Sequence, residues 1–273
     1  MNKPKPPIKG RLLRLFLWLA GIAVAFVVYG DLFGPQTAAY GAAHWIAWKD
    51  PTVNIVPQPL NYGSASESPG TTLSYFGNSF EAPWKGLVEQ KQSANIKVVA
   101  FASGQALMIW APMGKTGELE GITADKEIGS PAMRNLFADE LKSTPYQQTW
   151  IILNATTSQV KFLDPARVSS RTLELLLFKE MGEIESETGM YSFQTSTARG
   201  FQLGNPASTW RTRLDFFDSA GNSLGEISCW LGKTPSARGT QAEINRIIQT
   251  FHPVTSASNN SPSPAILPAS ARK

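Results

Sequence analysis

The stretch WRTRLDFFDSAGNSLGEISCWL, residues 210–231, carries the clearest fold signal in the chain. Two runs within it alternate apolar and polar side chains, which is typical of β-strands with one buried face. Residues 220–222, Ala-Gly-Asn, predict the turn that joins the two runs. We therefore expect an antiparallel strand pair that turns these side chains inward: Thr212, Leu214, Phe216, Ile227, Cys229 and Leu231.

The opposite face of this strand pair predicts an interaction surface. Alternation places Arg211, Arg213 and Trp230 on that face if both strands keep their register. A tryptophan beside two arginines is a composition enriched at protein interfaces. The alternative is that a helix covers this face and Trp230 belongs to the core. With two further tryptophans judged in the same way, the candidate interaction patch comprises Arg211, Arg213, Trp230, Trp84 and Trp110.

Strand and helix signals surround this pair and predict an α+β fold. Residues 73–82 and 96–110 read as two hairpins, and residues 114–129 read as a loop. Ser-Pro and Thr-Pro pairs open helices near residues 131 and 145, a third helix starts near residue 169, and a capping box at Thr240 to Glu243 opens the last. The expected domain is an antiparallel sheet with covering helices, preceded by one N-terminal transmembrane helix.

Residues 12–33 predict that membrane anchor. Residues 15–30 carry no charge and span roughly 24 Å as a helix, somewhat less than the roughly 30 Å hydrocarbon thickness of a bilayer. Arg14 can reach the interface at one end, and Leu32 and Phe33 complete the other. Five basic residues and no acid precede the segment, which retains the amino terminus in the cytoplasm. We expect a single-pass inner-membrane protein with its carboxy-terminal domain outside the cytoplasm.

A cleaved signal peptide is the alternative, because its apolar region has a similar length. No small-residue cleavage site follows closely, since residues 28–30 match poorly and residues 39–41 lie too far on. The prediction is therefore an uncleaved anchor. The expected layout is a basic cytoplasmic tail (1–14), a transmembrane anchor (15–33), a Pro-rich spacer (34–70) that includes a short helix near 38–48, a globular extracytoplasmic domain (71–254) and a disordered tail (255–273).

Composition excludes several functional classes. Residues 71–254 hold 17 Lys and Arg against 18 Asp and Glu, so the basic excess lies outside the domain and we expect no nucleic-acid partner. Cys229 is the only cysteine and there are two histidines. The domain therefore has no internal disulfide, and a thiol metal cluster or a zinc enzyme is not expected.

No motif assigns a catalytic, cofactor or metal site. The Gly-Lys-Thr sequences at 114–116 and 232–234 lack the earlier glycine of a phosphate-binding loop. Glutamates 183, 185 and 187 fit a solvated loop better than a calcium site, which needs oxygens that converge. Neither His44 nor His252 has a catalytic partner suggested by spacing. We therefore predict no cofactor and no metal.

Three segments carry a family resemblance. FGNSFEAPW (76–84), RGFQLG (199–204) and EINRIIQ (243–249) resemble segments of a family of uncharacterised bacterial membrane-anchored proteins. This resemblance covers most of residues 71–254 and implies no activity. The order of elements is also similar to that of the Mog1/PsbP-like α/β/α sandwich, which implies a non-catalytic accessory or binding module.

The sequence thus predicts a non-enzymatic accessory or binding module at the outer face of the inner membrane. Its expected partners are the membrane, through the N-terminal helix, and an envelope protein. Two alternatives stay open. One is an envelope hydrolase that uses carboxylates such as Glu81, Glu118 or Glu120, which requires two acids in one cleft. The other is a small-ligand or lipid binder, which requires a concave cavity.

Overall fold

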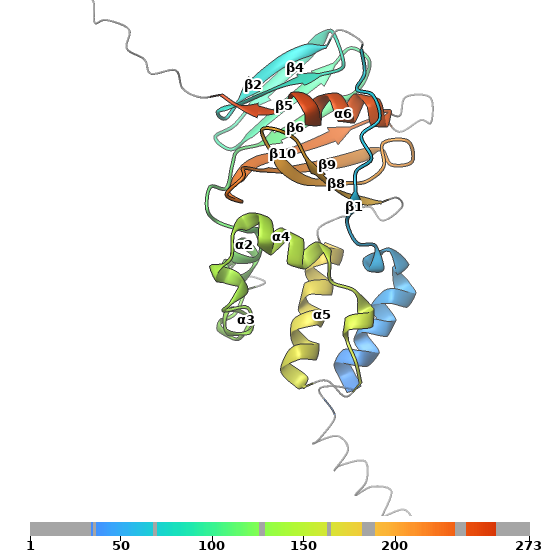
Figure 1. Cartoon of the computed structure of the whole chain (residues 1–273), viewed down its shortest axis with the longest axis vertical. Helices are drawn as coiled ribbons and strands as arrows, with labels where there is room; N and C mark the ends of the chain where they lie inside the picture. The colour runs from blue at the N-terminus through green and yellow to red at the C-terminus, as the bar shows by residue number, and fades with distance from the viewer. Residues whose placement is uncertain are drawn as a thin grey trace, which may run out of the picture.

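The structure is a computed structural model that describes residues 34, 37–67, 70–125, 129–162, 165–181, 189–232 and 239–254. It stacks a sheet-rich half on a helical half (Figure 1). The α+β prediction is confirmed, with a large and mostly antiparallel sheet. Among the described residues no helix is long and apolar enough to cross a membrane. The predicted anchor and both predicted tails lie outside the described residues.

The main sheet has the strand order β1-β7-β8-β9-β10-β6-β5-β4. All neighbours are antiparallel except β1 and β7. Leu214 faces Ile227 across the central pair, as the alternating pattern predicts. The strands are β1 (Gln58–Pro59), β4 (Leu87–Gln92), β5 (Ile96–Phe101), β6 (Ala106–Trp110), β7 (Met190–Gln194), β8 (Arg199–Leu203), β9 (Arg211–Phe217) and β10 (Ser223–Trp230).

One face of this sheet packs on α6 (Gln241–Thr250) and on a small sheet of β2 (Thr71–Tyr75), β3 (Asn78–Ala82) and β11 (His252–Pro253). The predicted capping box at Thr240 and Glu243 begins α6. Residues Ile244, Ile247 and Ile248 of α6 share one core cluster with the inward side chains of β9 and β10, including Cys229. This confirms the inward face of the predicted strand pair, and burial of the Cys229 thiol raises its pKa.

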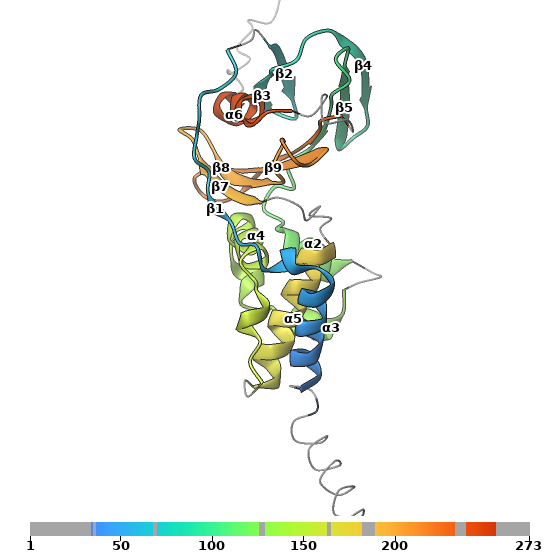
Figure 2. The ribbon, with the colours of Figure 1, turned by 90° about the vertical axis from the view of Figure 1, so that its right-hand side faces the viewer.

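The helical half lies against the other face of the sheet (Figure 2). A separate core cluster holds it together, with the fully buried Leu119, Phe137 and Leu176 at its centre. Its helices are residues 37–49, α2 (Glu118–Ala124), α3 (Pro131–Leu136), α4 (Pro145–Leu153) and α5 (Ala166–Met181), with short 3-10 turns η1 (Pro51–Asn54), η2 (Glu140–Lys142) and η3 (Thr157–Gln159). Ser130 and Thr144 cap α3 and α4, as their sequences predict.

Three features differ from the prediction. The expected spacer is folded in part: Ala43 and Ile46 of helix 37–49 are buried in the helical core, and β1 pairs with β7. Strand β4 was not predicted, because all six of its residues are exposed and show no alternation. Helix α2 replaces part of the expected loop, because its short apolar pattern is completed only by contacts with α4.

Lys179 of α5 connects three segments of the helical half. Its Nζ donates to the carbonyl oxygens of Ile55 at 2.6 Å and Ala155 at 2.9 Å, and the residue is 3% exposed. This burial lowers the pKa of Lys179 from 10.5 to about 8. The folded protein therefore releases this proton at a lower pH than the unfolded chain does.

We expect the free energy of unfolding to rise with pH above about 8 because of Lys179. Between the two pKa values the unfolded chain binds one proton more than the folded protein, so stability increases by up to about 1.4 kcal/mol per pH unit. Chemical denaturation of the wild type and of Lys179→Met at pH 8, 9 and 10 measures this effect. The free energy of unfolding of the wild type, relative to that of Lys179→Met, should increase steadily with pH. A difference that stays constant would contradict the prediction.

Candidate functional site

A cavity of about 370 Å³ opens between the helical half and the sheet face that turns away from α6. It lies where β9 and β10 meet the first residues of α2 and α4. We call it the acidic cavity, because three carboxylates and a single arginine form its polar wall. Its lining comprises Asn95, Trp110, Ala111, Pro112, Met113, Glu118, Pro145, Thr149, Arg213, Asp215, Phe217, Ser223, Gly225 and Glu226.

The strands place two of the carboxylates beside the arginine. Arg213 and Asp215 are two residues apart on β9, so they share one face of the sheet. Glu226 on β10 is directly opposite Asp215 in the register. Gly225 has a φ of +127° at an irregularity of β10, and a Cβ there would lie 2.8 Å from the carbonyl oxygen of Trp110. Glycine thus allows the end of β6 to approach β10 closely at the cavity wall.

The third carboxylate, Glu118, comes from the helical half. It is the first residue of α2, and Gly117 is the N-cap. A Cβ on Gly117 would clash with the amide of Gln148, which is buried on α4. That amide accepts a hydrogen bond from the backbone N–H of Glu120 at 3.2 Å and donates to the carbonyl of Ser143 at 3.2 Å. The close approach of α2 and α4 therefore sets the position of Glu118.

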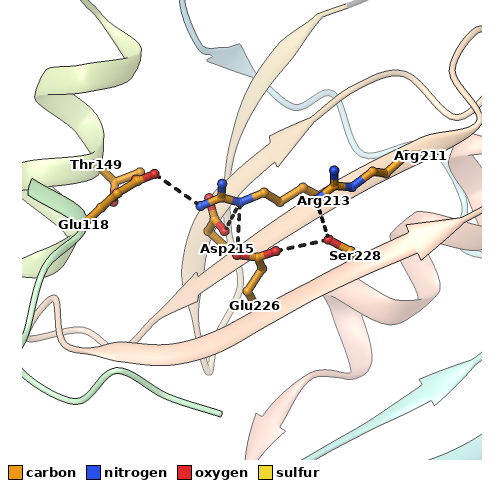
Figure 3. A network of polar contacts seen from close by, with 7 residues as sticks. All are labelled: Glu118, Thr149, Arg211, Arg213, Asp215, Glu226 and Ser228. Atoms are coloured by element: carbon orange, nitrogen blue, oxygen red, sulfur yellow. Dashed lines mark hydrogen bonds and ion pairs between the residues drawn. The ribbon is translucent and has the colours of Figure 1, made fainter. Parts of the chain in front are cut away.

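Arg213 is the centre of the polar wall (Figure 3). Its Nε lies 2.8 Å from Asp215 Oδ1 and 3.3 Å from Glu226 Oε2, and its Nη2 lies 3.6 Å from Glu118 Oε1. Thr149 Oγ1 donates to Glu118 Oε2 at 3.4 Å, and Ser228 Oγ donates to Glu226 Oε1 at 3.1 Å. One guanidinium thus holds carboxylates from the sheet and from a helix around a single point.

Burial changes the proton affinity of this group. Burial, helped by the negative charges of Glu226 and Glu118, raises the pKa of Asp215 to about 7 against the opposing effect of Arg213. Burial by itself lowers the pKa of Arg213, but the three carboxylates outweigh it and keep this pKa well above the ordinary value. Arg213 therefore stays charged while Asp215 titrates near neutral pH.

Asp215 Oδ2 is buried and has no hydrogen-bond partner among the described residues. A buried acceptor of this kind costs about 1–3 kcal/mol when it stays unpaired. The residue is 5% exposed and forms part of the cavity wall. Asp215 therefore adds an unmet acceptor within the cavity wall, and the wall has an excess of negative charge toward any molecule that enters.

The predicted patch is only partly assembled. Arg213 and Trp110 line the acidic cavity. Arg211 and Trp230 lie beside it on the same strand pair: the Arg211 guanidinium carbon is 5.5 Å from the Trp230 ring centroid, and Nη2 donates to Ser228 Oγ at 3.4 Å. Trp230 in turn packs on Trp210 with ring centroids 4.5 Å apart.

Trp84 does not belong with these residues. It is 5% exposed, packs in the core cluster that includes α6, and donates from Nε1 to Glu243 Oε1 at 2.9 Å. The segment around it runs along the other face of the main sheet, so its aromatic ring serves the core instead of a surface. Its short sequence context carries no alternation that could have shown this.

The three carboxylates that the sequence suggested for a hydrolase, Glu81, Glu118 and Glu120, do not lie together in the structure. Only Glu118 lines the acidic cavity. Glu81 forms an ion pair with Arg246 of α6, and Glu120 is exposed on α2. The acids that do accompany Glu118 are Asp215 and Glu226, which sequence reasoning did not select. The available signal is strand alternation, which places Asp215 and Glu226 on the same face as Arg213.

Among the described residues no group of three or more His, Cys, Asp or Glu side chains is placed to hold a metal ion. The predicted acidic loop at 183–187 lies outside the described residues, and neither His44 nor His252 belongs to the cavity lining. Comparison with protein-family models, with curated proteins and with solved structures finds no match to this chain.

Proposed function

We propose that this protein is a non-enzymatic binding module, anchored in the inner membrane by residues 15–33, that holds a small ligand in the acidic cavity of its extracytoplasmic domain. The observation that carries the proposal is a cavity of about 370 Å³ whose wall gathers three carboxylates around Arg213, one of them with an oxygen, Asp215 Oδ2, that is buried and unpaired among the described residues. Ligand sites combine a concave, mainly apolar lining with a few convergent polar groups, which this cavity has. The basic N-terminal residues and the uncharged run that follows support the location.

The expected result is a bound small molecule, detected by native mass spectrometry of the full-length chain purified from membranes in a mild detergent. A reproducible added mass at one-to-one stoichiometry supports the proposal. Asn95 is exposed and lines the cavity, so Asn95→Trp should reduce the fraction of chains that carry the added mass at least tenfold. If that fraction stays unchanged, or if no added mass is found in the wild type, the proposal fails.

A hydrolase is the second candidate, and one observation favours it. Asp215, with its pKa raised to about 7, shares a cavity with Glu118 and Glu226. A carboxylic acid with a pKa near neutral beside other carboxylates is a pattern found in general acid catalysis. Against it, all three acids contact the same guanidinium. Release of a cleaved product, instead of an intact ligand, from the purified protein would favour this candidate.

A further inference from the structure

We propose that the ligand of the acidic cavity is a small organic amine, protonated and carrying an apolar body. This inference rests on the proposed function and names the class of molecule that the cavity selects. Three properties of the lining support it: its unmet need for donors, its excess of negative charge and its apolar side chains.

The polar wall has more acceptors than donors. The two oxygens of a carboxylate can together accept about four hydrogen bonds. Asp215 Oδ2 has no partner among the described residues, and the donors that Glu118 contacts, Thr149 Oγ1 and Arg213 Nη2, lie at 3.4 and 3.6 Å. These distances exceed those of strong charge-assisted hydrogen bonds, about 2.7–2.9 Å. The ligand must therefore supply N–H or O–H donors.

The charge of the wall selects among donors. Three carboxylates surround one guanidinium, so the wall carries a net negative charge even when Asp215 holds a proton. An ammonium group brings a positive charge and three donors and has no acceptor that the carboxylates would repel. A hydroxyl brings one donor and two lone pairs, and an anion is repelled. The wall therefore fits an ammonium group best.

Apolar side chains in the lining of the cavity provide the surface for an apolar body. Its side chains are Trp110, Pro112, Met113, Pro145 and Phe217. Trp110 is 39% exposed and is opposite Glu226 across β6 and β10. An aromatic face close to carboxylates attracts organic cations through both its ring and its apolar area. An amine with an aromatic or short aliphatic body therefore matches both the polar and the apolar residues of the lining.

The test compares three probes of one shape: phenethylamine, 2-phenylethanol and 3-phenylpropionate. Isothermal titration of the full-length chain in detergent at pH 7.5 should show that phenethylamine binds at least tenfold more tightly than either of the others. N-acetylglucosamine serves as a neutral polyhydroxy probe and should bind at least tenfold more weakly too. Titration of detergent alone corrects for uptake of the probes by micelles.

Two variants locate the binding. Asp215→Asn preserves the shape of the side chain but removes its charge, and Glu118→Gln does the same on the helical side. Each should weaken phenethylamine binding at least tenfold. Glu120→Gln is the matched control, because Glu120 lies two residues after Glu118 on α2 and outside the cavity lining. This variant should bind phenethylamine as tightly as the wild type does. Glu118→Gln keeps the test decisive if Asp215→Asn fails to fold.

The pH dependence provides a readout that a purely structural role of Asp215 does not predict. Burial raises the pKa of Asp215 to about 7, and a bound cation favours the ionised carboxylate. The groups that face Asp215 are Arg213, Glu226 and Glu118, and Arg213 stays charged throughout. Phenethylamine should therefore bind more tightly at pH 8 than at pH 6, with the pH dependence reduced in Asp215→Asn.

The outcomes separate the two proposals. Equal or tighter binding of 2-phenylethanol or N-acetylglucosamine overturns the amine class while the cavity remains a ligand site. Binding of phenethylamine that Asp215→Asn and Glu118→Gln do not weaken also overturns it. If no probe binds but native mass spectrometry finds an endogenous ligand without an amine, only this inference fails. If neither method finds a ligand, the proposed function fails with it.

Discussion

Replacing Arg213 by methionine should destabilise the folded protein by about 3–5 kcal/mol at pH 7.5, the range measured when one partner of a buried ion pair is removed. Arg213 is the cation that Asp215, Glu226 and Glu118 all contact. Without it, three carboxylates remain close together in a largely buried wall. Equilibrium unfolding in urea measures the loss.

The loss should depend on pH in a defined direction. Removing Arg213 raises the pKa of Asp215 in the folded state further above its unfolded value, because the charges of Glu226 and Glu118 are no longer offset. The folded variant then binds more protons than its unfolded chain, so its stability falls as pH rises. The difference between wild type and Arg213→Met should therefore be smaller at pH 5 than at pH 8.

Two further variants test the origin of this effect. Adding Asp215→Asn and Glu226→Gln to Arg213→Met should recover at least half of the lost stability, because two uncompensated charges are removed. Lys142→Met breaks a highly exposed ion pair with Asp139 and should leave unfolding unchanged. If Arg213→Met is as harmless as Lys142→Met, the electrostatic account of the acidic cavity is wrong.

Gly200→Ala should cost about 3 kcal/mol or more, near the upper end of the usual cost of overpacking. Gly200 lies on β8, opposite Phe193 on β7 and Phe216 on β9. A Cβ at this position would clash with the carbonyl oxygen of Asp215 and would lie 2.6 Å from Cζ of Phe193. Backbone cannot move aside as a flexible side chain can, so the strands must separate.

Gly121→Ala is the matched control for this substitution. A Cβ on Gly121 meets nothing within 4 Å, and the residue lies inside α2. Alanine there should raise the free energy of unfolding by about 0.5–1 kcal/mol, because glycine in a helix is entropically unfavourable. Thermal and urea unfolding of both variants measure the contrast. Because the clash is with the backbone of Asp215 itself, Gly200→Ala should also weaken ligand binding if the variant folds.

Local patterns were sufficient where one element buries a regular face. The strand pair of residues 211–230, the capped start of α6 and the capped starts of α3 and α4 all follow from short-range periodicity and from side-chain caps. Exposed β4 and short α2 were missed, because neither has enough apolar periodicity to distinguish it from a loop.

The sequence predicts one part of the candidate site and not the other. Alternation along 211–230 determined that Arg213, Asp215 and Glu226 share a face, because side chains of a strand alternate whatever lies above them. Neither that pattern nor any motif revealed that Glu118 comes to the same point. That contact joins residues 95 positions apart and depends on how α2 packs on α4.

The sequence by itself thus determined the fold class, the inward face of the central strand pair and the polar face that carries Arg213. These follow from local sterics and from the hydrophobic effect acting on a repeating pattern. Only the tertiary structure decided that the helical half covers this face, that Trp84 lies in the core, and that Asp215 Oδ2, in the cavity wall, has no partner among the described residues. Burial, and the pKa of Asp215 that depends on it, is a property of what distant segments place around a side chain, which no local spacing encodes.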